Sequence, residues 1–141
     1  MVLPGGVQEP GPPAGGGGAP GALPHGHADG VQVAVFPECA VTGYHTGPTI
    51  DATAEQLEAA AAEIGRACAR KRIGAVVGSV YKTGGRAYNV ALVYNEKGEL
   101  VERYGKLQLA GEKWATPGNH MALFELGGVP STVIICHDER Y

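Results

Sequence analysis

The sequence has 141 residues, with 11 lysines and arginines against 14 aspartates and glutamates, and a net charge of -3 at pH 7. Basic residues gather only in the run 66–72, where they end a predicted helix and favour its dipole, so the composition indicates no nucleic-acid partner. No apolar run approaches the roughly 18 residues of a membrane span, and the N-terminus lacks a signal-peptide or transit-peptide pattern, so we expect a cytoplasmic protein without a membrane partner.

Glycine and proline dominate the start of the chain. The first 30 residues hold 10 of the 23 glycines and 6 of the 10 prolines. Such a segment has little apolar surface to bury and would lose much conformational entropy on ordering, which predicts a flexible tail over residues 1–28. The folded domain is then expected over residues 29–141, a length sufficient for one core.

The run 30–36 is short, apolar and rich in valine, which is typical of a strand covered on both faces. Pro37 ends this strand, and the glycines, threonines and proline of 42–48 predict a loop. Residues directly after the strand therefore lie at the carboxyl end of a predicted sheet, where side chains leave the packed core.

A helix is predicted over residues 54–71. Thr53 and Gln56 have the spacing of a capping box at its start. Apolar residues then recur at helical spacing, at Leu57, Ala60, Ala61, Ile64 and Cys68. Because a cysteine on such an apolar face is usually a small core residue, we expect Cys68 to be buried and inert.

Further strands follow the helix. The valine-rich run 73–81 completes the order strand, helix, strand, which predicts parallel pairing with the first strand. Turn signals then separate runs with the composition of strands at 87–95, 100–109, 121–126 and 131–136. The sum is an α/β fold with a mixed sheet.

Three reactive residues lie on or beside predicted strands. Glu38 follows the strand 30–36, Lys106 lies within the strand 100–109, and Cys136 ends the strand at 131–136. A thiol needs a base to act as a nucleophile, and a developing oxyanion needs a fixed positive charge. Taken singly, however, such a glutamate can cap a turn, such a lysine can be solvated and such a cysteine can be core.

The cysteines Cys39, Cys68 and Cys136 are odd in number and lack paired spacing. They predict neither a disulfide framework nor a CxxC metal site, so free thiols in a reducing compartment are the simplest interpretation.

Local motifs add a family resemblance. "FPECAVTGY", "RYGKLQL" and "IICHDERY" resemble, in this order, the segments around the glutamate, the lysine and the cysteine of the nitrilase or carbon-nitrogen hydrolase superfamily. The likeness covers roughly residues 28–141. It implies part of a four-layer α-β-β-α sandwich that is incomplete at its C-terminal side, in a chain truncated at both ends relative to the family.

The resemblance implies a catalytic triad of Glu38 as base, Lys106 as oxyanion stabiliser and Cys136 as nucleophile. The backbone N–H of His137 would complete the oxyanion site. Glu112 aligns with a second glutamate that family members place between the lysine and the cysteine, oriented toward the lysine. The resemblance implies no cofactor and no metal.

Neighbours of these residues receive lesser roles. Cys39 would be a bystander, since it points to the opposite face from Glu38 if the extended backbone continues. Asp138 and Arg140 match motif positions that support the turn after the cysteine.

Two functions remain open at this point. In the first, the protein hydrolyses a non-peptide C–N bond of a small amide or N-carbamoyl compound, less readily a nitrile, through a thioester intermediate. In the second, it is an inactive truncated or degenerate family member that acts only by association. The expected partners are a small-molecule substrate and further copies of the chain in a homo-oligomer.

Overall fold

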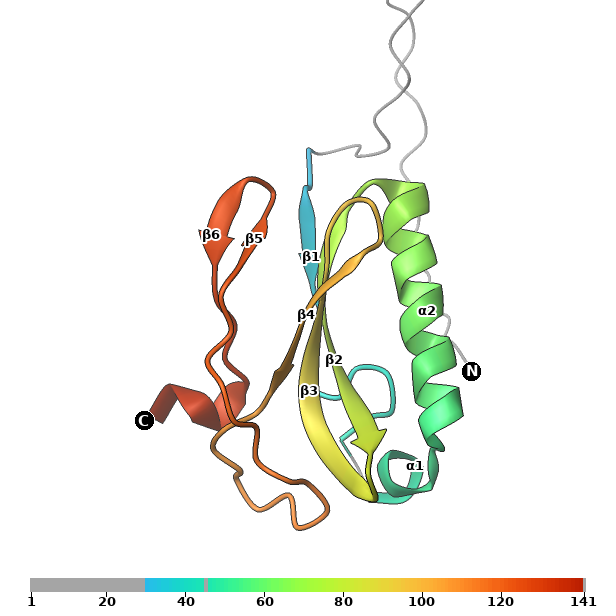
Figure 1. Ribbon diagram of the computed structural model, residues 1–141, viewed down its shortest axis with the longest axis vertical. Coiled ribbons are helices and arrows are strands. Elements are labelled where there is room, and N and C mark those ends of the chain that lie inside the picture. Colours follow the sequence, from blue (N-terminus) through green and yellow to red (C-terminus); the bar gives the residue numbers. More distant parts are fainter. Residues whose placement is uncertain (1–29, 45, 141) are drawn as a thin grey trace, which may run out of the picture.

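The computed structural model describes residues 30–44 and 46–140. Its centre is a four-stranded sheet in the order β1-β2-β3-β4, in which β1 pairs parallel with β2 and the other pairs are antiparallel (Figure 1). The strands are β1 (Val33–Val35), β2 (Gly74–Thr83), β3 (Arg86–Tyr94) and β4 (Leu100–Gly105). The predicted α/β class with a mixed sheet is confirmed, and the tail predicted for 1–28 lies outside the described residues.

Helix α2 (Ala54–Lys71) forms where the sequence predicts it. The Thr53 side-chain oxygen accepts a hydrogen bond from the Gln56 backbone N–H at 3.2 Å, and the Gln56 side chain accepts one from the Thr53 N–H at 2.9 Å. This capping box pairs two backbone donors that the helix itself cannot pair. The helix ends where Arg72 adopts a left-handed conformation with φ of 52°. Within the described part of the chain, no helix has both the length and the apolar character to cross a membrane.

One core lies between α2 and the sheet. The buried face of α2 supplies part of it, and alternate side chains of β2 and β3 supply the rest. Its buried members are Ala61, Cys68, Ala75, Val77, Val90, Leu92 and Tyr94. Cys68 is therefore a core residue, as its place on the apolar face of the helix predicts.

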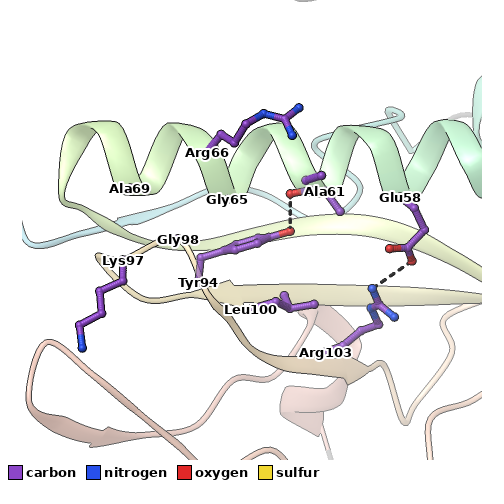
Figure 2. A pocket seen from close by; sticks show the side chains of 11 residues that line it. Glu58, Ala61, Gly65, Arg66, Ala69, Tyr94, Lys97, Gly98, Leu100 and Arg103 are labelled. Atoms are coloured by element: carbon purple, nitrogen blue, oxygen red, sulfur yellow. Dashed lines mark hydrogen bonds and ion pairs between the residues drawn. The ribbon is translucent and has the colours of Figure 1, made fainter.

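Tyr94 and Arg103 connect α2 to the antiparallel strands (Figure 2). The Tyr94 hydroxyl donates a hydrogen bond to the Ala61 backbone oxygen at 2.9 Å, and Arg103 Nη2 pairs with Glu58 Oε1 at 3.0 Å. Burial raises the pKa of Tyr94 to about 12, so its hydroxyl remains a donor at neutral pH. An open pocket of about 360 Å³ lies between α2 and the turn that joins β3 to β4.

The C-terminal segment covers the opposite face of the sheet. The hairpin of β5 (Phe124–Leu126) and β6 (Val129–Ser131) lies across the sheet from α2 (Figure 1). A second core forms there from buried Ala91, Tyr104, Ala122 and Ile135. The sheet is thus enclosed between α2 and the C-terminal segment.

Two elements near the start of the described chain differ from the prediction. The first strand spans only Val33–Val35, and Val35 is 75% exposed, so the expectation of a strand covered on both faces is wrong. The reason is that little of the described chain packs on the face of β1 that carries Val35, and β1 is also an edge strand, with β2 as its neighbour on one side and no described strand on the other. A short helix, α1 (Thr46–Asp51), replaces part of the predicted loop, and a proline in a first helical turn is compatible with it.

The predicted strand at 131–136 is also wrong. β6 ends at Ser131, and the Ile135 N–H donates a hydrogen bond to the Asp138 carboxylate at 3.0 Å instead of to a neighbouring strand. The apolar character of this segment comes from packing onto the second core. A 3-10 helix, η1 (Cys136–Arg140), follows it.

Candidate active site

A buried cluster of opposite charges lies at one end of the sheet. Lys106 Nζ pairs with Glu38 Oε1 at 2.7 Å and also with Glu112 Oε1. The side chains of Lys106 and Glu112 are 0% and 1% exposed, and that of Glu38 is 17% exposed. We call these three residues the carboxylate–lysine cluster. With all three ionised, two negative charges face one positive charge.

Glu38 reaches the cluster because the chain turns tightly against β2 after leaving β1. The Val41 N–H donates a hydrogen bond to the Gly78 carbonyl at 3.2 Å. Gly78 permits this close approach, since a Cβ at that position would lie 2.6 Å from the Glu38 Cα. Any side chain at position 78 would therefore push Glu38 away from the strand.

Lys106 is the first residue after β4, so the prediction that it lies within a strand over 100–109 is wrong. Its N–H donates to the Asn89 carbonyl at 2.8 Å, which continues the register of the sheet. Its own carbonyl accepts from the Gly118 N–H at 2.8 Å. Gly118 approaches so closely that a Cβ on it would lie 2.1 Å from the Gly105 oxygen. The segment around Gly118 thus binds the backbone of Lys106 in place of a neighbouring strand, and β4 ends at Gly105.

Glu112 lies in the compact loop after β4. Its second oxygen, Oε2, accepts a hydrogen bond from the Ala110 N–H at 2.5 Å. Burial alone would raise the pKa of this carboxyl, but the hydrogen bond from Lys106 and those from backbone N–H groups outweigh burial and lower it to about 2. Glu112 is therefore ionised at neutral pH.

Lys106 keeps its positive charge in the same surroundings. Burial alone would lower its pKa, but the hydrogen bonds to Glu112 and Glu38 and the charges of both carboxylates raise it above its ordinary value. A fixed ammonium in a buried environment is suited to stabilise negative charge that develops during a reaction, because little solvent screens it.

Cys136 begins η1 and is exposed. Its backbone is left-handed, with φ of 46°, a conformation that non-glycine residues adopt only where the surroundings hold them. The buried Asp138 carboxylate provides this hold, because it accepts hydrogen bonds from the N–H groups of Leu107, Gln108 and Ile135 at 3.1, 2.7 and 3.0 Å. The first two of these donors directly follow the cluster lysine in the chain, so the turn with the cysteine is anchored beside the cluster.

The structure thus brings three predicted site residues, Glu38, Lys106 and Glu112, into direct contact. Cys136 and His137 lie in η1, in the anchored turn. The arrangement offers a carboxylate, an ammonium and an exposed thiol within one region, and these are the groups that thiol-based acyl transfer needs.

The expectation that Cys39 points away from Glu38 is wrong. Cys39 has a φ of 52° inside a turn, so side chains no longer alternate as they do along a strand. Its thiol is fully buried and donates to Asn89 Oδ1 at 3.7 Å. Burial, together with the charges of Glu38 and Glu112, raises the pKa of Cys39 to about 11, so this thiol stays protonated at neutral pH.

Sequence reasoning assigned no role to Asn89, which lies at the centre of the site. Its Nδ2 donates to Glu38 Oε1 at 2.7 Å and to Glu112 Oε1 at 3.4 Å. The available signal was an amide side chain within the apolar run 87–95, because a buried amide must find hydrogen-bond partners.

The pocket in Figure 2 is separate from this site. Its lining comes from α2, β3, β4 and the turn between them, and includes no member of the carboxylate–lysine cluster. It also contains no cysteine, serine or threonine. We therefore place the candidate active site at the cluster and at the turn of η1.

The family model of carbon-nitrogen hydrolases matches residues 22–141. The matched segment contains the cluster and the turn with Cys136. The chain therefore belongs to the carbon-nitrogen hydrolase family, within the nitrilase superfamily.

Relatives agree with this assignment. The chain is 25% identical over 127 residues to Nitrilase homolog 2 of Dictyostelium discoideum, with 80% of this chain and 39% of that protein covered. It is 29% identical over 120 residues to the 2-oxoglutaramate amidase of Bacillus subtilis (strain 168), with 82% and 45% covered. A crystal structure of an amidase from Nesterenkonia sp. matches with a TM-score of 0.73 at 26% identity, over 79% of this chain and 45% of that one. The chain spans less than half the length of these relatives.

Proposed function

We propose that the chain hydrolyses a non-peptide C–N bond in a small amide or N-carbamoyl compound, less readily in a nitrile, with Cys136 as nucleophile. The observation that carries this proposal is the buried carboxylate–lysine cluster beside the anchored turn of η1. Membership in the carbon-nitrogen hydrolase family and similarity to two amidases support the substrate class.

In the proposed reaction, Glu38 accepts the proton of the Cys136 thiol while the sulfur attacks the carbonyl carbon. A C–S bond forms and the π electrons of the carbonyl move to its oxygen. Lys106 and the backbone N–H of His137 stabilise this oxyanion, and one well-placed donor typically contributes about 3 kcal/mol.

The tetrahedral intermediate then collapses. The C–N bond breaks, and the nitrogen takes the proton held by Glu38, so that ammonia or an amine leaves and a thioester remains on Cys136. Glu38 next accepts a proton from water, whose oxygen attacks the thioester carbon. The C–S bond breaks, the acid leaves, and the thiol recovers its proton from Glu38.

Glu112 has a different part in this scheme. Because the pKa of Glu112 is about 2, it stays ionised while Glu38 gains and loses a proton. Lys106 therefore keeps a counter-charge at every step and remains in place for the oxyanion.

The test compares the reactivity of one cysteine across three proteins. N-ethylmaleimide is a suitable probe, since it alkylates a thiolate much faster than a protonated thiol. Labelling of Cys136 near pH 6 is followed by peptide mass spectrometry in the unmodified chain, in Glu38→Gln and in Glu125→Gln. An ordinary thiol is almost wholly protonated at this pH. We expect labelling at least about tenfold slower in Glu38→Gln than in the unmodified chain.

Glu125→Gln is the matched control, because Glu125 is an exposed carboxylate on β5, outside the cluster. It should label like the unmodified chain, and urea should remove all differences. A second measurement, release of ammonia from a panel of small amides with a thioester mass on Cys136, reports turnover. Equal labelling in all three proteins, with no thioester, would contradict the proposal and favour an inactive family member that acts by association.

A further inference from the structure

Asn89 is a polar residue inside an otherwise apolar strand. It lies on β3, pairs across the sheet with Val80 on β2, and is 1% exposed. A buried carboxamide that lacked partners would destabilise the fold, because its donor and acceptor would lose their hydrogen bonds to water. The groups that it contacts therefore indicate its role.

These contacts lie within the candidate active site or at its border. Asn89 Nδ2 donates to Glu38 Oε1 and Glu112 Oε1, and Oδ1 accepts from the Cys39 thiol. Lys106 Nζ reaches the same two carboxylate oxygens. Asn89 and Lys106 thus form two parallel bridges between the carboxylates, one neutral and one charged.

An uncharged side chain at position 89 has an advantage over a charged one. Two buried carboxylates repel each other, and one ammonium does not fix both of them in orientation. A second cation at position 89 would hold them equally well, but it would disfavour the protonation of Glu38 on which the proposed mechanism depends. A carboxamide holds the carboxylates without adding charge.

We propose that Asn89 is a positioning residue of the candidate active site, which holds Glu38 and Glu112 on either side of Lys106 and leaves the charge of the cluster unchanged. Its catalytic consequence rests on the proposed function, whereas its effect on the carboxylates does not. In an active protein, Asn89→Leu should lower kcat about tenfold and leave KM within about twofold, because the amide acts on Glu38 and not on the substrate.

The direct test is a titration that needs no substrate. Carboxyl carbons of 13C-labelled glutamates are followed by NMR against pH in the unmodified chain, in Asn89→Leu and in Val90→Ala, with Glu112→Gln used to assign the signal. We expect the Glu112 midpoint to rise by about one pH unit in Asn89→Leu, because the carboxylate loses a donor. Val90→Ala disturbs the neighbouring residue in the core and should leave the midpoint unchanged.

Asn89→Asp independently tests whether the side chain at position 89 must donate a hydrogen bond to the carboxylates. It preserves the shape of the side chain but offers a donor only when its new carboxyl is protonated. The folded state should therefore favour the protonated form, and stability in urea should rise as the pH falls from 7 to 5. This result supports the proposal even if Asn89→Leu does not fold.

Two results would overturn the positioning role: an unchanged Glu112 midpoint in folded Asn89→Leu, or an Asn89→Asp stability profile equal to that of the unmodified chain. Neither depends on turnover. A missing thioester on Cys136 would instead refute the proposed function and leave the titration result intact, so the two failures are distinguishable.

Discussion

The carboxylate–lysine cluster and the turn of η1 hold the two parts of the candidate active site in opposite ways. In the cluster, Lys106 and Glu112 are buried, and several hydrogen bonds fix each of them. In the turn, Cys136 is exposed, and the buried carboxylate of Asp138 secures its place from a distance of two residues. Burial and charge pairing thus fix the charged groups, whereas a single anchor fixes the thiol. A substitution in one part should therefore leave the structure of the other part intact.

Lys106→Met should break the cluster and has the largest expected effect. The substitution keeps an unbranched side chain of similar length but leaves two largely buried carboxylates without their cation, which typically costs about 3 to 5 kcal/mol. Unfolding in urea measures the loss. Lys113→Met is the control, because Lys113 is exposed in the same loop and its change should stay within about 0.5 kcal/mol. Equal unfolding free energies of the two variants would show that Lys106 does not stabilise the buried carboxylates of Glu38 and Glu112.

Asp138→Ala should break the turn and leave the cluster intact. It removes the acceptor of the Tyr104 hydroxyl and of the three backbone N–H groups described above, with a cost of about 3 kcal/mol. Cys39 should nevertheless stay slow to alkylate under native conditions, since the cluster around it is unchanged. Rapid labelling of Cys39 in this variant would mean that the loss of the anchor in η1 also disrupts the carboxylate–lysine cluster.

Gly78→Ala should move the turn 37–39, which carries Glu38, and leave the turn of η1 in place. The added Cβ would lie 2.6 Å from the Glu38 Cα, so the turn must shift, at a cost of about 2 to 3 kcal/mol. Gly47→Ala provides the control, because a Cβ at Gly47 meets nothing within 4 Å. Thermal unfolding of both variants measures the difference, and equal melting temperatures would contradict the close approach.

The smallest expected effect is the loss of the stabilisation from Glu112 as the pH falls. The pKa of Glu112 falls from 4.5 in the unfolded reference to about 2 in the folded chain, so its contribution is present above pH 4.5 and is lost as the pH falls toward 2. Between pH 4.5 and 3 this loss amounts to about 1 to 2 kcal/mol. Urea unfolding across this window should show that the unfolding free energy of Glu112→Gln depends less steeply on pH than that of the unmodified chain. Equal dependence on pH in the two proteins would contradict the lowered pKa of Glu112.

Local signals in the sequence predicted part of this fold well. The capping box at Thr53 and the apolar spacing up to Cys68 act within one helix, so they specify α2 without reference to the rest of the chain. The motif residues Glu38, Lys106 and Glu112 also meet in the structure, although their resemblance to a family, and not their spacing, brought them together in the prediction.

Other features depend on contacts that a sequence does not display. The positive φ values of Cys39 and Cys136 come from turns that pack against distant segments, so extended backbone was the wrong assumption at both positions. The end of β4 depends on Gly118, which returns from later in the chain to bind the Lys106 carbonyl. The sequence assigns Asn89 no role for the same reason, since its partners Glu38 and Glu112 are 51 and 23 residues away.

The unequal exposure of the thiols has a consequence for oxidation. Cys39 and Cys68 are buried in separate parts of the core, and Cys136 is exposed. An oxidant in solution therefore meets one thiol per folded chain, and the disulfide that forms most readily joins two copies through Cys136. Air oxidation would link two copies covalently through Cys136 and so remove the proposed nucleophile, and a reductant would break this link and restore the thiol.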